Sequence, residues 1–346
     1  MKHLILAGIL VLLLAAGCSN KSKIRSQAQE VYQQGIELLG TGAVNDLLKA
    51  TDLFRKSVQI DSTFAAGYAQ IAITNAYLAG NYNFLSPEKA YSEAIPAADK
   101  AVTLDADLPE GYVAKALIDQ YHNWKWLEAD RNLKRALEIE PDNVEILLEN
   151  GWSEIILNKP EEAGKMFEKA KQLAPDSPRV RSFLVFEMIY SGRFDEARKH
   201  ILDVINTNPQ DAYGYWDMAV LCSKEGSHEE AIKNLNIQIP LMKGDIADEL
   251  ALLGYNYGRI GKIDEALAQL TRLDEAAANG IYVSPVDKAW IYCGINDKEN
   301  ALVNLEKGLE RRSNRMGYDL RFYSFIYQPI ADDPRFIELL KKSNLQ

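Results

Sequence analysis

Small and apolar residues recur along this chain at a nearly constant interval. Eight of its alanines follow this interval, and after a first step of 44 residues every later step is 34 or 35 residues long. Another apolar residue stands four positions after each alanine, which places both side chains on one face of a helix, one turn apart. The recurring alanines are Ala50, Ala94, Ala129, Ala163, Ala197, Ala231, Ala266 and Ala301.

Each helix that carries one of these alanines is predicted to be the second of a pair, with a first helix before it. Twelve positions before the alanine, four of the last five copies carry a small residue, which allows two helices to approach closely. A proline that cannot continue the helix ends three of the copies. The pattern therefore predicts stacked helical hairpins. The small positions are Gly151, Ala219, Gly254 and Ala289, with Val185 as a bulky exception, and the prolines are Pro141, Pro175 and Pro209.

The 34-residue period resembles that of the tetratricopeptide repeat (TPR). The clearest copy contains Leu253, Gly254 and Tyr255, followed by a short turn at Gly261. The resemblance implies an all-α fold, a right-handed TPR superhelix (α-solenoid) of about eight helix-turn-helix repeats. A last helix that begins at Asp333 is expected to cap it.

A narrower resemblance covers residues 47–340. The array is similar to those attached to bacterial adenylate cyclases, winged-helix regulators and TolB-like proteins. Three segments carry this similarity, namely 54–61, 121–126 and 327–336. In those relatives the array accompanies a catalytic or DNA-binding domain, and we recognise neither in this sequence.

The N-terminus predicts a secreted, lipid-anchored protein. Lys2 precedes thirteen uncharged and mostly apolar residues, 4–16, which are too few to span a bilayer. Residues 14–18 resemble the bacterial lipobox, which implies acylation of Cys18; a plain signal peptide is the alternative. We therefore expect a lipoprotein signal peptide at 1–17, a lipidated tether at 18–27 and the TPR solenoid at 28–346.

This anchor implies a place in the bacterial cell envelope. Several acyl chains on one cysteine bind a membrane essentially permanently. In an organism with two membranes the sequence favours the periplasmic face of the outer membrane, because the residue after Cys18 is Ser19 and not aspartate. In an organism with one membrane it predicts the outer face of the plasma membrane.

Charge and motifs argue against several functions. The formal net charge of −10 disfavours nucleic acid as a partner. We find no catalytic motif, no metal-ligand spacing and no cofactor signature, so we expect no enzyme, no catalytic residues, no metal and no cofactor. Cys222 and Cys293 fall on first helices two repeats apart and are expected to be buried small hydrophobes.

Aromatic side chains recur at one position of the first helices. TPR arrays line their concave face with first-helix residues, so this stripe predicts a groove that binds a protein or peptide partner. Packing between neighbouring repeats explains the recurrence equally well, and both interpretations stay open at this point. The candidate partner-binding residues are Trp152, Phe186, Trp216, Tyr255 and Trp290.

Two smaller features complete the sequence-based picture. Trp124 and Trp126 flank Lys125. This arrangement suggests a structural wedge, in which the two rings are buried and the lysine between them is solvent-exposed. A basic group near the C-terminus is expected at a solvated helix end, with an acidic partner or a phosphate as the alternative. This group comprises Arg311, Arg312, Arg315 and Arg321.

Together these features predict a non-catalytic, membrane-anchored adaptor that binds a protein or peptide along its groove. The alternative is a lipoprotein that uses the aromatic groove to bind carbohydrate or peptidoglycan. The rings have mainly apolar neighbours and few groups that could bind sugar hydroxyls, so the sequence favours a protein ligand.

Overall fold

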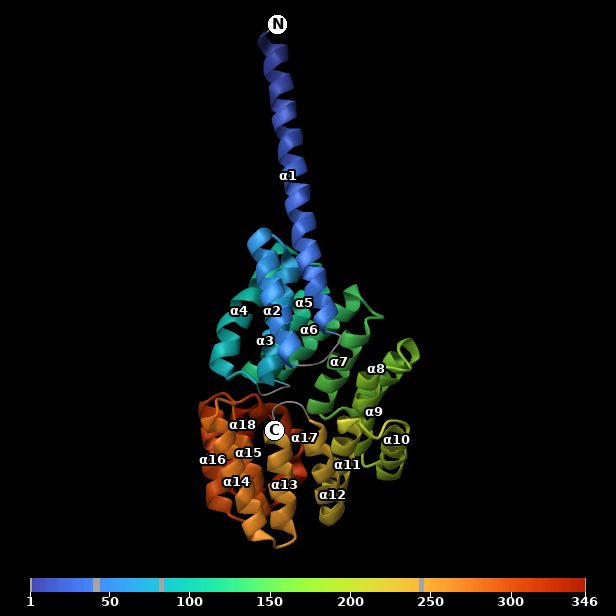
Figure 1. Ribbon diagram of the computed structural model, residues 1–346, viewed down its shortest axis with the longest axis vertical. Helices are drawn as coiled ribbons and strands as arrows, with labels where there is room; N and C mark the ends of the chain where they lie inside the picture. The colour runs from blue at the N-terminus through green and yellow to red at the C-terminus, as the bar shows by residue number, and fades with distance from the viewer. Residues whose placement is uncertain (1, 40–43, 81–83, 243–245, 346) are drawn as a thin grey trace.

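The computed structural model describes residues 2–39, 44–80, 84–242 and 246–345, with side chains from residue 21 onward (Figure 1). Every regular element in these ranges is a helix, and sixteen of them form eight successive hairpins. The hairpins are α1 (Lys2–Leu39) with α2 (Val44–Ile60), α3 (Ala65–Gly80) with α4 (Pro87–Leu104), α5 (Pro109–Ile118) with α6 (Trp126–Ile139), α7 (Val144–Ile156) with α8 (Pro160–Leu173), α9 (Pro178–Tyr190) with α10 (Phe194–Thr207), α11 (Ala212–Glu225) with α12 (His228–Leu241), α13 (Ala247–Arg259) with α14 (Ile263–Ala278), and α15 (Pro285–Gly294) with α16 (Lys298–Glu310).

The remaining elements are short. A π-helical turn, η1 (Asp119–Asn123), joins α5 to α6. The chain ends with α17 (Arg315–Phe322), the 3-10 helix η2 (Ser324–Ile330) and α18 (Pro334–Lys342).

The repeating alanines explain the hairpins. All eight lie on the second helix of a pair, and none exposes any surface. The residue four positions later is also buried, and Phe167 shows its role. Its ring packs where a side chain on Gly151 would stand, so the small residue of one helix receives the bulky residue of the other. The predicted fold of about eight TPR hairpins is confirmed.

Two later first helices approach even more closely. A Cβ atom on Gly258 of α13 would stand 2.5 Å from the carbonyl carbon of Gly294 in α15. Backbone cannot move aside as a side-chain tip can, so we expect Gly258→Ala to cost about 1–3 kcal/mol of unfolding free energy. Urea denaturation followed by circular dichroism measures this cost.

Gly164→Ala is the matched control for that substitution. Gly164 lies inside α8, and a Cβ there would meet only an ordinary contact at 3.9 Å. Alanine favours a helix over glycine by up to about 1 kcal/mol, so this variant should be at least as stable as the parent. Equal effects at the two glycines would contradict the close crossing of α13 and α15.

The end of the chain returns to its early hairpins. Figure 1 shows the hairpins following an arc that brings the C-terminal helices beneath α3 and α4. The Asn314 side chain donates to the carbonyl of Gly80 at 2.7 Å, and α17 packs against η1 and α7. The last helix, α18, begins at the N-cap Asp333 and buries Phe336 as expected of a cap. The array is therefore closed by long-range contacts as well as by stacking.

The N-terminal helix projects from the body (Figure 1). This helix, α1, includes most of the predicted signal peptide and all of the predicted tether. Its residue Arg25 forms an ion pair with Asp61 of the α2–α3 connection at 3.1 Å. The side chain of Cys18 lies outside the described residues. Within the described chain no helix is long and apolar enough to cross a membrane.

Candidate partner-binding groove

The candidate stripe lies on the inner side of the array, where the first helices of successive hairpins face α17 and η2. Trp290 is fully buried and Tyr255 is 4% exposed, whereas Trp152, Phe186 and Trp216 are half-buried. The open groove considered from the sequence is therefore largely filled in this structure.

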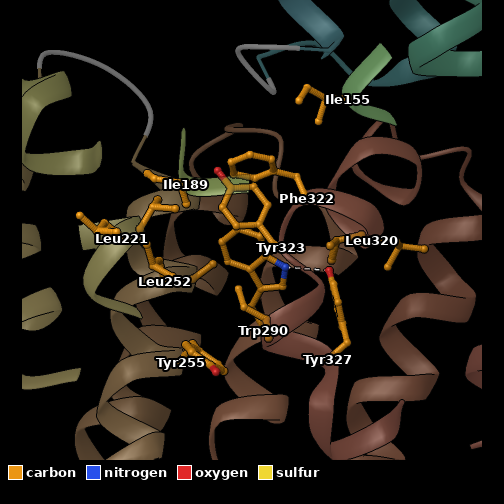
Figure 2. Close-up of a cluster of buried hydrophobic side chains, with 14 of the residues drawn as sticks. Ile155, Ile189, Leu221, Leu252, Tyr255, Trp290, Leu320, Phe322, Tyr323 and Tyr327 are labelled. Atoms are coloured by element: carbon orange, nitrogen blue, oxygen red, sulfur yellow. Dashed lines mark hydrogen bonds between the residues drawn. The ribbon is translucent and has the colours of Figure 1, made fainter. Parts of the chain in front are cut away.

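The chain's own C-terminal segment, residues 313–345, fills the groove. Phe322 inserts between first helices of two hairpins, with its ring centroid 5.6 Å from that of Trp152 and 5.4 Å from that of Phe186. Tyr323 packs on Trp290 at 4.7 Å, as Figure 2 shows. The Nε1 of Trp290 also donates to the hydroxyl of Tyr327 at 2.8 Å.

The candidate residues thus divide into two groups. Trp152, Phe186, Tyr255 and Trp290 contact rings of the C-terminal segment, and a partner would have to displace that segment to reach all four. Trp216 is half-buried and has no ring contact with the segment among the described residues. Partner binding by the five residues stays a prediction.

Arg315 corrects one expectation. It is 1% exposed and does not lie at a solvated helix end. Its guanidinium pairs with Asp248 of α13 at 2.7 Å and with the buried carboxylates of Asp287 and Asp319. The same group stacks on the Trp290 ring, 4.3 Å from its centroid. This arginine fastens the C-terminal segment to two first helices.

The other three arginines of that group behave differently. Arg311 and Arg312 are exposed, as expected for a helix end. Arg321 is half-buried and donates to the carbonyl of Leu345 at 2.8 Å. The basic group is therefore no single surface patch.

The acid cluster around Arg315 gives the fold a pH dependence. Burial raises the pKa of Asp287 to about 8 and that of Asp319 to about 7, against the lowering effect of Arg315. Unfolded aspartates titrate near pH 4, so the folded state binds more protons between these values. Stability contributed by these groups should fall as the pH rises from about 5 to about 8.

Asp319→Asn provides the comparison for that prediction. Its amide oxygen can still accept from the Nε of Arg315, but the group no longer titrates. The difference in urea midpoint between parent and variant should therefore change with pH over this window. A difference that stays constant from pH 5 to pH 8 would contradict the raised pKa of Asp319.

The tryptophan wedge is confirmed. Trp124 and Trp126 are both buried, whereas Lys125 between them is exposed. Each tryptophan also holds the end of the chain. Trp126 Nε1 donates to the Ser343 carbonyl at 2.9 Å, and the Asn344 side chain donates to the Trp124 carbonyl at 3.0 Å.

A second buried network closes the inner side nearer the N-terminus. Glu149 accepts hydrogen bonds from the Tyr77 hydroxyl at 3.0 Å and from Arg179 at 2.7 Å. These residues stand on α3, α7 and α9 of three different hairpins, and burial raises the pKa of the glutamate. The network was not anticipated from the sequence, because its members are 30 to 102 residues apart.

One part of the inner side stays open. A cleft of about 240 Å³ lies between the ends of α11 and α13 and the helix η2, and Tyr255 forms part of its wall.

The two cysteines that the structure describes with their side chains, Cys222 and Cys293, are both buried thiols, as expected. Within the described residues no three His, Cys, Asp or Glu side chains are grouped to hold a metal ion.

Comparisons with known proteins agree with this architecture. No family model matches the chain. The human protein O-mannosyl-transferase TMTC3 is 28% identical over 190 residues, which are 54% of this chain but 20% of that protein. The chain therefore matches only about a fifth of this curated relative.

Solved structures match over more of the chain. The human IFIT1 dimer with m7Gppp-AAAA superposes with a TM-score of 0.61 at 17% identity, over 92% of this chain and 71% of IFIT1. Yeast Tom70 gives a TM-score of 0.52 at 19% identity, over 91% of this chain and 67% of Tom70. Such identities show the fold alone. With its repeat period, its hairpin packing and these neighbours, the chain has the fold of a tetratricopeptide repeat protein.

Proposed function

We propose that this chain is a non-catalytic interaction scaffold that is held at a bacterial envelope membrane by acyl chains on Cys18. It binds a protein or peptide partner on the inner side of its array. The proposal rests on the way in which the first helices bind α17 and η2. Aromatic side chains of the first helices α7, α9 and α15 already hold a short helical segment of the chain itself.

The partner is expected where the C-terminal segment leaves the inner side accessible. Trp216 is half-buried on α11, and the open cleft beside Tyr255 lies at the end of the same helix. A partner could reach both places while the C-terminal segment stays in place. Displacement would be costly, because Phe322 and Tyr323 are both buried.

A photo-crosslinking side chain in place of Trp216 tests partner binding in living cells. We expect one discrete protein adduct, identified by mass spectrometry. The same side chain in place of the exposed Leu127, on a second helix, is the control and should not give that adduct. A glycan adduct at Trp216 would support the carbohydrate alternative, and an adduct pattern equal to that of the control would contradict the scaffold proposal.

The anchor is tested separately. Cys18→Ser should move the protein from the membrane fraction to the soluble fraction, because one acylated cysteine supplies the attachment. The parent protein should also incorporate a labelled fatty acid, and the variant should not. Equal membrane retention of the two proteins would contradict lipidation at Cys18.

A further inference from the structure

The open cleft has an unusual charge for this chain. Among its charged side chains are Lys224 at the end of α11 and Arg259 at the end of α13. The carboxylate of Glu225 also borders the cleft, but Arg198 pairs with it. Across the described residues no carboxylate lies within ion-pair distance of Lys224 or Arg259. Lys224 and Arg259 therefore line one cleft without a carboxylate partner among the described residues, in a protein of net charge −10. The Lys224 ammonium also lies 5.6 Å from the centroid of the Tyr190 ring.

Lys224 is held in place without an anion. Its Nζ donates to the carbonyl of Ile189 at 2.8 Å, which leaves two further N–H groups for another acceptor. Burial lowers the pKa of this lysine, since no neighbouring carboxylate stabilises its charge. An anion bound in the cleft would supply that missing stabilisation.

His228 is oriented by a buried amide. The Asn256 side chain donates to the Leu252 carbonyl at 2.8 Å, which fixes the amide with its oxygen toward the histidine. His228 Nδ1 lies 2.8 Å from that oxygen, and because an amide oxygen only accepts, Nδ1 is the donor. The ring is thereby held in edge contact with Tyr255, their centroids 5.9 Å apart.

An aromatic wall stands beside these polar groups. Tyr255 meets Phe325 of η2 edge to face, with ring centroids 6.3 Å apart. A volume of about 240 Å³ corresponds to about eight water molecules and is smaller than the usual pocket for a small-molecule ligand. The cleft therefore has room for one side chain of a peptide, with the rest of the peptide outside.

We propose that this cleft binds an acidic side chain of the partner peptide, whose methylene groups pack on Tyr255 and Phe325 while the neighbouring apolar residue of the peptide stays at the rim. The cations supply charge-assisted hydrogen bonds to the carboxylate. This inference rests on the proposed scaffold function and names the chemistry of its ligand. Because one wall belongs to η2, the bound peptide also holds the C-terminal segment in place.

Two matched peptides test the charge requirement. The probes are N-acetyl-phenylalanyl-glutamate amide and its glutamine counterpart, titrated into the full chain by isothermal calorimetry. Hydrogen bonds between charged groups predict that the glutamate peptide binds at least about tenfold more tightly. Arg259→Gln should reduce this advantage to about twofold or less. The exposed Lys233, on α12 outside the cleft, gives the control Lys233→Gln, which should keep the advantage.

Other outcomes would overturn the inference. These are equal binding of the two peptides, no binding of either, or loss of the advantage in both variants. Stronger binding of inorganic phosphate than of the glutamate peptide would assign the cleft to phosphate instead. Arg259 is exposed, so its variant should melt like the parent, and a lower melting temperature would show a structural role for Arg259 and count against the cleft.

A structural readout distinguishes this cleft from the scaffold as a whole. The glutamate peptide should slow amide hydrogen exchange in residues 323–330, and exchange in α2 should not change. A protein adduct at Trp216 together with an unchanged exchange rate in η2 would retain the scaffold and reject the cleft. Slower exchange in η2 without any adduct in cells would retain the cleft and reject the cellular scaffold.

Discussion

Arg315→Met is expected to destabilise the protein by about 3–5 kcal/mol, which is the cost of leaving buried charges without their partner. The substitution keeps an unbranched, shorter apolar side chain but removes the guanidinium, and it leaves Asp287 and Asp319 without their cation in a dry environment. Both carboxylates are fully buried, so water cannot take the place of the guanidinium. Urea denaturation at pH 8, where both acids tend to ionise, should show the largest loss.

Arg311→Met is the matched control. Arg311 stands four residues earlier and is exposed, so the same chemical change should alter stability by about 0.5 kcal/mol or less. The two substitutions separate a buried anchor from a surface charge within one cluster of arginines. Similar losses for the two variants would contradict the burial of Arg315.

Phe322→Ala should cost a similar amount, about 3–5 kcal/mol, because it removes a buried ring from a packed aromatic cluster. The ring contacts those of Trp152, Phe186 and Tyr190 on α7 and α9, which precede it by more than 130 residues in the sequence. We also expect the emission of Trp152 to shift to longer wavelength as water reaches its ring. Fluorescence and urea denaturation measure the two effects on one sample.

Phe84→Ala provides the comparison. Phe84 is 38% exposed, so the same truncation there should cost about 1 kcal/mol or less and leave tryptophan emission unchanged. A small loss at Phe322 would mean that the C-terminal segment is held weakly in solution and that the groove is accessible.

The repeat could be predicted from sequence because its information is local. The alanines at one position and the bulky residues four positions later, such as Ala163 and Phe167, occupy one helix face. Each hairpin repeats the same local requirement, so the period alone indicated the fold. The cap that begins at Asp333 was predictable for the same reason.

The contents of the groove could not be predicted in this way. A period of 34 residues places Trp290 and Tyr255 on the inner side whether that side is open or filled. Arg315 was misplaced because its partners Asp248 and Asp287 lie 67 and 28 residues away, and no local pattern joins them. One signal was available, since residues 318–327 contain five aromatic residues, an unusual density for a solvated chain end.

This occupied groove changes how the scaffold is expected to work. The aromatic stripe contributes mostly to the core, and the half-buried Trp216 and the cleft beside Tyr255 are the places where the proposed partner would bind. Specificity would then depend on Lys224 and Arg259, which stand at the ends of two first helices, more than on the buried rings.

The C-terminal segment is expected to fill the inner side of the array in solution. Benzoylphenylalanine in place of Phe322 tests this expectation most directly, because the photo-reactive ring takes the position of the native ring. On irradiation of the purified full chain we predict intramolecular cross-links to α7 and α9, at Trp152, Phe186 or Tyr190. Cross-links confined to the neighbouring α16 and α18, or formed mainly between molecules, would show that the segment lies outside the groove and would contradict this account.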